Sequence, residues 1–201
     1  SPYDDRKYKY IKLSNDLEVV LIHDKKLTYS AASISVGVGS YYDPWKYQGL
    51  SHFLEHMLFM GSKKFPDENY FSEYVKQNGG YDNAYTANEI TNYHFKIQSK
   101  GFEHALEIFA RFFIDPLLTP DAIEREVKAV ASEHSKNLTN DYWRFSGVLS
   151  WVSNKKSIYH KFGTGNMDSL YKDKLNDALI KHHSKYYSAN NMKFVINSSY
   201  P

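Results

Sequence analysis

Cysteine is absent from this sequence of 201 residues, and that absence excludes three kinds of chemistry. Disulfide bonds, thiol catalysis and cysteine-ligated zinc are all ruled out, and a chain without cysteine suits a reducing compartment. A long apolar run is also missing, because no stretch reaches the roughly 18 residues that a membrane-spanning helix needs. We therefore predict a cytoplasmic protein without a membrane span.

An excess of charge of one sign is missing as well. The sequence has 25 Lys and Arg residues against 23 Asp and Glu residues, a formal net charge of +2. This balance does not favour binding to nucleic acid or to an anionic membrane. The chain begins without methionine and without a signal-peptide pattern, which indicates a mature or excised chain. Hydrophobic residues make up 42% of it, enough for an independent core at this length.

The pattern of apolar and turn-forming residues predicts an α+β protein. Strands and helices mix without the strict alternation of parallel α/β folds, which favours a two-layer domain with a mostly antiparallel sheet packed under helices. Helix 120–136 has the clearest start, with Thr119 as its N-cap and Pro120 at its first position. The expected strands are 8–13, 18–23, 31–39, 81–87, 92–98 and 192–197, and the expected helices are 48–60, 67–77, 102–114, 120–136, 142–152 and 172–187.

The segment H-F-L-E-H at residues 52–56 places two histidines and a glutamate on one helical turn. At about 100° of rotation per residue, the side chains of His52, Glu55 and His56 fit within an arc of roughly 100°. Imidazoles at positions i and i+4 can reach one metal ion, and the glutamate can reach a water on that metal. The alternative is a pair of half-buried histidines on an amphipathic helix. Because burying these groups among apolar neighbours costs several kcal/mol unless they are paired or bind a metal, we favour a metal site.

A catalytic zinc usually has three protein ligands, so the third must come from another part of the chain. The predicted helix 120–136 carries Glu126 and Glu133 two turns apart, on a face shared with Val130. That half-apolar face predicts an inward orientation, with Glu133 as the third ligand and Glu126 supporting a ligand imidazole. On spacing alone His134 is a rival to Glu133, and two glutamates at this spacing are also typical of a solvated helix face.

Together these segments resemble the pitrilysin and insulin-degrading enzyme family of zinc peptidases, the insulinase-like M16 family. That family's pattern is H-x-x-E-H, then 76 residues, then the third-ligand glutamate, and residues 57–132 of this chain have that length. The segments "GGYDNAYTANEITNYHF" (79–95) and "FGTGNMDSL" (162–170) also resemble the insulin-degrading branch. The continuation "HMLFMGSKKFP" favours this branch over two-subunit processing peptidases of mitochondrial type.

The resemblance implies a zinc-dependent endopeptidase with one zinc per domain. It identifies His52, His56 and Glu133 as the zinc ligands and Glu55 as the general base. Glu126 matches the family's supporting glutamate and belongs to the same catalytic group.

The resemblance also implies where a peptide substrate binds. Asn83, Ala84 and Tyr85 lie in the segment that matches the family's substrate-receiving strand. An extended peptide would add to that strand through its backbone.

Members of the insulin-degrading branch are much longer than this chain, with four related domains around a chamber. We therefore expect residues 1–201 to be a single N-terminal peptidase domain, a fragment of a longer enzyme whose remaining domains are its partners along with peptide substrates. Because the family's C-terminal half supplies an arginine and a tyrosine near the scissile bond, the fragment is expected to bind metal but not to cleave peptides efficiently by itself. The alternative is a non-catalytic peptide-binding or scaffold relative, although such relatives typically lose part of the motif.

Two further groups of residues are expected to have structural roles. His182 and His183 are predicted to be exposed near a helix end. Trp45, Trp143 and Trp151 are predicted to lie in the core or at a contact with another domain.

Overall fold

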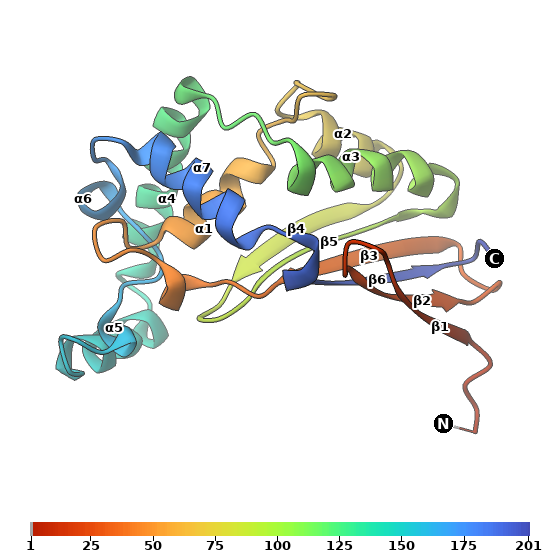
Figure 1. Cartoon of the computed structure of the whole chain (residues 1–201), viewed down its shortest axis with the longest axis horizontal. Coiled ribbons are helices and arrows are strands. Elements are labelled where there is room, and N and C mark those ends of the chain that lie inside the picture. The colour runs from red at the N-terminus through yellow and green to blue at the C-terminus, as the bar shows by residue number, and fades with distance from the viewer. Residues whose placement is uncertain (1) are drawn as a thin grey trace.

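The protein consists of a six-stranded mixed sheet with helices packed on one face (Figure 1). The structure is a computed structural model and describes residues 2–201. Within the described chain, β2 and β6 are the one parallel pair and the other neighbours are antiparallel. The predicted α+β class with a mostly antiparallel sheet is therefore confirmed. In spatial order the strands are β1 (Lys7–Lys12), β2 (Glu18–His23), β6 (Met192–Ser198), β3 (Tyr29–Val36), β5 (Thr91–Gln98) and β4 (Tyr81–Thr86).

The helices form a second layer of the domain. Figure 1 shows α1, α2, α3 and α7 above the sheet, with α5 extending away from it at the lower left. The helices are α1 (Leu50–Leu58), α2 (Tyr70–Gln77), α3 (Phe102–Ile114), α4 (Pro120–Asn137), α5 (Asp141–Val152), α6 (Met167–Leu170) and α7 (Leu175–Tyr186).

The core lies between the two layers because each layer has one apolar face. Alternate residues of β3 are buried, as the two-residue period of a strand requires. Helix α1 contributes the fully buried side chains of Phe53, Leu54, Met57 and Leu58. Burying a side chain of this size contributes about 1.5–3 kcal/mol, so α1 is firmly held on the sheet. The helix that carries the H-x-x-E-H segment is therefore a rigid support.

Capping residues in the sequence predicted the start of one helix correctly and the start of another wrongly. Helix α4 begins as predicted, with Thr119 accepting a hydrogen bond from Ala122 N and Pro120 in the first turn. The predicted helix 172–187 was wrong at its start. A separate short helix, α6, precedes it. Its N-cap is Asn166, whose side chain forms a capping box with Ser169. Lys174 then takes a left-handed φ of 63° before α7 starts.

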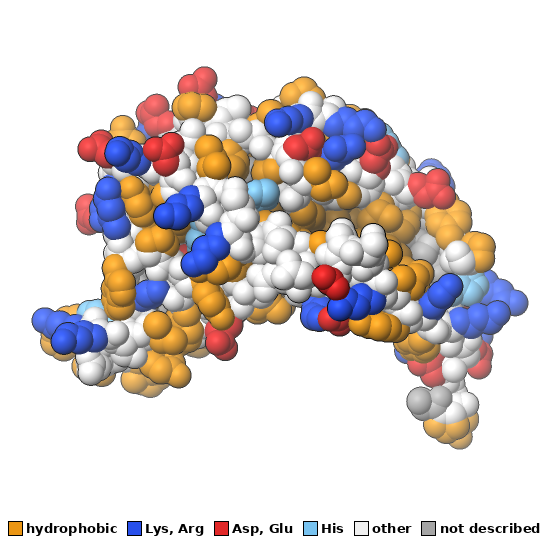
Figure 2. Space-filling model, in the orientation of Figure 1, with side chains coloured by type: hydrophobic (Ala, Val, Ile, Leu, Met, Phe, Trp, Pro, Cys, Tyr) orange, Lys and Arg blue, Asp and Glu red, His pale blue; other side chains and the backbone are white. Residues whose placement is uncertain are grey.

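Helix α5 has no buried residue. Figure 2 shows hydrophobic side chains gathered over this part of the molecule, at the lower left. Trp143 and Trp151 are 44% and 77% exposed, and Trp45 in the loop before α1 is 48% exposed. The core placement predicted for the three tryptophans was therefore wrong, and the domain contact stays a prediction. The exposed apolar residues of α5 are Tyr142, Trp143, Phe145, Val148, Leu149, Trp151 and Val152.

None of the helices in residues 2–201 combines the length and the apolar character that crossing a bilayer demands.

Candidate metal and catalytic site

Helix α1 presents His52 and His56 on one side, one turn apart. Their ring centroids lie 4.9 Å apart with the rings nearly perpendicular. The side chains are 14% and 25% exposed, so both imidazoles reach solvent only at one edge. The arc predicted from the helical spacing therefore places two nitrogen donors side by side.

Helix α4 crosses α1 and brings Glu133 to the same place. Oε2 of Glu133 lies 3.6 Å from Nε2 of His52 and also 3.6 Å from Nε2 of His56. One ligand atom from each of the three residues falls within 4.8 Å of the others. Val127 and Val130 of α4 are fully buried in the core to which α1 also contributes, and the two helices are in contact. His134 turns elsewhere, and its ring packs edge-on against Phe162.

The other nitrogen of each imidazole is also engaged. His52 Nδ1 lies 2.7 Å from the backbone oxygen of Thr164, and His56 Nδ1 lies 3.1 Å from Oε2 of Glu126. A carbonyl or carboxylate oxygen only accepts, so both Nδ1 atoms carry the proton and donate it. That leaves the Nε2 atom of each ring to face Glu133. Such outer partners fix the tautomer of a metal-binding histidine.

The charges of the neighbouring side chains shift the pKa values of His56 and Glu133. Burial lowers the pKa of His56, but the carboxylates of Glu126 and Glu133 outweigh it and raise that pKa to about 9. The His56 imidazole in turn holds the pKa of Glu133 below its usual value. In the metal-free protein these residues therefore form an ion-paired group at neutral pH.

Glu55 lies on the inner side of the same turn. Its Oε2 accepts a hydrogen bond of 2.5 Å from the hydroxyl of Thr86, the last residue of β4. Burial raises the pKa of the Glu55 carboxyl, although the Thr86 hydroxyl and the two imidazoles act in the opposite direction. A carboxylate with a raised pKa is a better proton acceptor near neutral pH, which suits a general base.

The donor set fits a zinc ion. Two imidazole nitrogens and one carboxylate oxygen are the ligands of many catalytic zinc sites. Donors at tetrahedral positions about 2.1 Å from zinc would be roughly 3.4 Å apart, close to the 3.6 Å between Glu133 Oε2 and each Nε2. Both Nδ1 protons already have acceptors, which leaves each Nε2 to bind the metal.

The segment predicted to bind substrate lies on an edge strand. Strand β4 pairs with β5 on one side and is the last strand in the sheet. Asn83 and Tyr85 are on its outer face, Ala84 is on the inner face, and Ala84 N–H donates to the side chain of Asn83. The open edge is thus available for an added strand. Its inner face ends at Thr86, which contacts Glu55.

Sequence reasoning missed three contributors to this geometry. Asp43 accepts from Gly49 N and Ser51 N and so caps α1 from a turn six residues upstream of its N-cap. Thr86 holds Glu55, and Thr164 holds His52 through its backbone carbonyl. An Asp-Pro pair before a helix is a readable signal, whereas a main-chain carbonyl leaves no signal in the sequence.

A second histidine network is structural. His182 is 4% exposed, so its predicted exposure was wrong, and the same holds for the partly buried His183. His182 Nε2 lies 3.0 Å from Ser51 Oγ, which donates to Asp43 at 2.6 Å. Burial lowers the pKa of His182 to about 4, with Lys185 contributing. Serine, histidine and aspartate do meet here, but Ser51 is fully buried and bonded to the aspartate, so it is no nucleophile.

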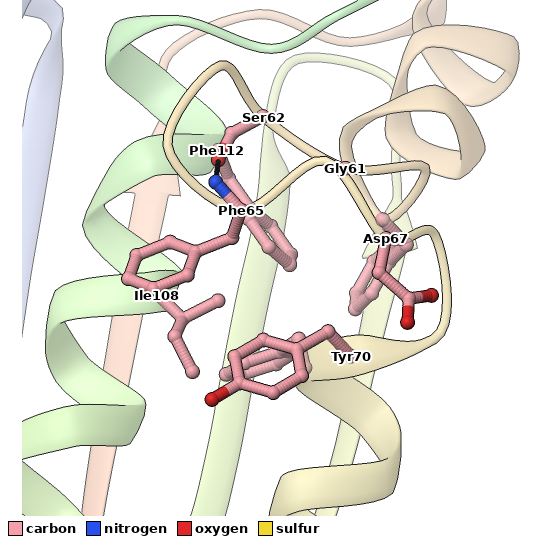
Figure 3. A pocket seen from close by; sticks show the side chains of 9 residues that line it. Gly61, Ser62, Phe65, Asp67, Tyr70, Ile108 and Phe112 are labelled. Atoms are coloured by element: carbon pink, nitrogen blue, oxygen red, sulfur yellow. Dashed lines mark hydrogen bonds between the residues drawn. The ribbon is translucent and has the colours of Figure 1, made fainter.

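A small pocket under the loop after α1 is also separate from this chemistry. Figure 3 shows Phe65, Tyr70, Ile108 and Phe112 around it, with Phe65 N–H donating to Ser62 Oγ. Its volume of about 10 Å³ has room for one water molecule. The pocket is therefore a packing defect between aromatic side chains.

Comparison with known proteins identifies the family of the chain. The sequence pattern described as Insulinase (Peptidase family M16) matches residues 18–154. An Arabidopsis thaliana protein named insulin-degrading enzyme-like 2 is 48% identical over 96% of this chain and 21% of its own length. The insulin-degrading enzyme of Homo sapiens is 43% identical over 96% of this chain and 19% of its own length.

The fold is similar to a solved structure over its whole extent. The crystal structure of pitrilysin matches with a TM-score of 0.96 and 38% identity, covering all of this chain and 22% of that one. The chain therefore spans about one fifth of the length of these relatives. With the family pattern matched over more than half of its residues, the chain belongs to the insulinase family of peptidases, family M16.

Proposed function

We propose that this chain carries the catalytic site of a zinc-dependent endopeptidase. In this proposal His52, His56 and Glu133 hold one zinc ion, Glu55 is the general base and Glu126 orients His56. The observation that carries it is the meeting of three ligand atoms within 4.8 Å, next to a buried glutamate that belongs to the same helical turn as the histidines. Burying a carboxylate among apolar neighbours costs free energy, and service to the metal site would account for keeping it there.

The chemistry divides between the metal and the chain. Zinc, when bound, would polarise the scissile carbonyl and make water more acidic. Glu55 would accept a proton from the attacking water and pass it to the nitrogen of the leaving amine. Thr86 would hold the Glu55 carboxylate during both transfers, and Glu126 would keep the His56 ring in its metal-binding tautomer.

The substrate in this proposal is a peptide in extended form. It would pair with the open edge of β4 at Asn83, Ala84 and Tyr85, so that backbone hydrogen bonds rather than side chains supply most of the affinity. The strand ends at Thr86, in contact with Glu55. A peptide added to this edge would therefore pass beside the base.

The relatives are about five times as long as this chain, so we infer that residues 1–201 act as one domain with further domains as partners. The N-terminal position of that domain and its cytoplasmic location both stay predictions. The second candidate is a non-catalytic peptide-binding or scaffold relative, which requires the metal site or the base to be lost or incomplete. A fragment that is inactive without its other half would instead keep both and lack only the groups that the missing half supplies.

Zinc content per chain tests the proposed function. The purified protein is dialysed mildly and analysed for zinc, and about one zinc ion per chain is expected from one site of three protein ligands. Folding is checked in the same sample by circular dichroism. A folded chain without zinc, even after zinc is added back, would contradict the proposal and favour the scaffold alternative.

Zinc affinity is expected to rise with pH up to about 9. His56 has a pKa of about 9 in the metal-free protein, so at lower pH its proton must leave before Nε2 can bind zinc. Between pH 7 and 9 the apparent affinity should rise about tenfold per pH unit, and above pH 9 it should level off. Calorimetric titrations with zinc, in buffers of different ionisation enthalpy, would measure the number of protons released on binding.

The matched variants for this pH dependence lie on α4. Glu126→Gln removes the carboxylate that raises the pKa of His56, so the levelling point should move to lower pH. Glu124→Gln, which removes an exposed partner of Lys128, should leave it unchanged. If the zinc affinity stops rising at the same pH in the parent, Glu126→Gln and Glu124→Gln, the role given to Glu126 is refuted.

Replacing Thr86 with Val is expected to reduce peptidase activity by about tenfold. Valine keeps the shape of threonine but removes the hydroxyl that donates to Glu55, and the unsatisfied carboxylate costs about 1–3 kcal/mol. The pKa of Glu55 should also rise, because the hydrogen bond lowers it. Thr86→Ser, which keeps the donor, should retain most of the activity. Equal activity in the Val and Ser variants would show that Thr86 does not hold the base.

A further inference from the structure

Residues 161–166 run along the N-terminus of α1 and supply neither a metal ligand nor the general base of the function proposed above. Lys161 Nζ donates to two backbone carbonyls in the turn before α1 and lies over the ring of Trp45. The Phe162 N–H donates to Oε1 of Gln48 at 2.7 Å. The segment is thus tied to the start of the helix by several contacts although it lies more than one hundred residues away in sequence.

Two glycines make the closest of these contacts. Gly49 is the N-cap of α1, and a Cβ atom added to it would lie 2.3 Å from Cα of Gly165. A Cβ added to Gly165 would lie 2.6 Å from Cδ1 of the fully buried Leu170. Both glycines have left-handed φ values, +87° and +84°, which side chains rarely adopt. The two backbones therefore meet at a distance that no larger residue allows.

This close approach sets the position of the preceding carbonyl. The buried Thr164 lies next to Gly165, and its backbone oxygen accepts the Nδ1 proton of His52 at 2.7 Å. We propose that residues 161–166 are a positioning segment for His52. The Thr164 carbonyl fixes the tautomer and direction of the imidazole, and the Gly49–Gly165 contact fixes where that carbonyl lies.

The consequence for metal binding rests on the proposed function, because it assumes that His52 Nε2 is a zinc ligand. Loss of an outer partner of a metal-binding histidine typically costs about 10- to 100-fold in metal affinity. Since the acceptor is a main-chain atom, the side chain at position 164 should be replaceable. The glycine at position 165 should not.

The experiment compares three variants of the whole chain by zinc titration against a competing chelator. Gly165→Ala is expected to weaken zinc binding by about 10- to 100-fold. Thr164→Ala keeps the carbonyl and should stay within about twofold of the parent, as should the control Gly147→Ala on α5. A Cβ at position 147 has no atom within 4 Å. If Gly165→Ala does not fold, Gln48→Ala removes the contact to Phe162 and should give a smaller loss of the same sign.

A second measurement reads the hydrogen bond itself, without metal. Long-range proton–nitrogen correlation spectra of the metal-free protein should show His52 with the proton on Nδ1 in the parent and in Thr164→Ala, and a mixed tautomer in Gly165→Ala. A proton on Nε2 in the parent, or unchanged zinc affinity in Gly165→Ala, would overturn the positioning role. If the parent binds no zinc, the proposed function fails while the tautomer still decides the hydrogen bond.

Discussion

Replacement of Glu133 with Gln is expected to weaken zinc binding by at least about 100-fold, more than the loss of an outer partner costs. The amide oxygen carries no charge, so the site would keep two neutral nitrogens and lose the anion that lies 3.6 Å from both of them. Folding should change little, by about 1 kcal/mol at most, because the Glu133 side chain is 43% exposed and its ion pair with His56 is partly screened by solvent. Chelator competition measures the first quantity and urea unfolding of the metal-free protein measures the second.

Two variants on the same helix make this result specific. Glu124→Gln changes an exposed glutamate paired with Lys128 and should leave the zinc affinity unaltered. His134→Ala tests the rival ligand, whose ring packs on Phe162, and should also leave it unaltered. Unchanged zinc affinity in Glu133→Gln together with a loss in His134→Ala would transfer the ligand role to His134.

Replacement of Glu55 with Gln is expected to leave zinc binding within a few-fold of the parent and to reduce peptide hydrolysis by about 10²- to 10⁴-fold. Gln has the same shape but accepts no proton, so the attacking water loses its base. The assay uses whichever form of the protein cleaves peptides, with turnover and zinc content measured on the same sample. Full activity with full zinc occupancy would remove Glu55 from the mechanism.

The same variant should not unfold the protein. Glu55 is 7% exposed, and a neutral amide in its place still accepts the Thr86 hydrogen bond while removing a buried charge. Stability equal to or slightly above that of the parent, measured by urea unfolding, would show that the loss of activity is chemical rather than structural.

The periodicity of apolar residues was sufficient to predict the two layers of the fold and to predict which side chains share one face of a helix. The apolar positions of α1 and the spacing of His52, Glu55 and His56 follow from about 100° of rotation per residue, and the structure has these side chains on one turn. Local capping chemistry likewise predicted the start of α4 at Thr119 and Pro120. Such features depend on neighbours within four residues, so a single sequence contains them.

Predictions that depended on what covers a surface were less successful. His182 was expected at a helix end in solvent, but α7 packs that end against α1 and buries it beside Ser51. Trp143 and Trp151 were expected to be covered. Helix α5 contacts the short helical turn Ile158–His160, but none of its residues is buried, and the two tryptophans stay exposed. A hydrophobic side chain favours burial, but whether it is buried depends on which distant element of the fold packs against it.

The sequence was enough to identify the kinds of side chain at the candidate site: two imidazoles and a glutamate on one helical turn, a carboxylate on another helix and no cysteine. Which of their atoms meet depends on the packing of the whole chain. That packing crosses α4 over α1 so that Glu133 rather than His134 faces the imidazoles, places Thr86 of an edge strand on Glu55, and brings the Thr164 carbonyl to His52. Contacts of this kind join residues 31 to 112 positions apart, and their geometry follows from the burial of whole faces rather than from any local pattern.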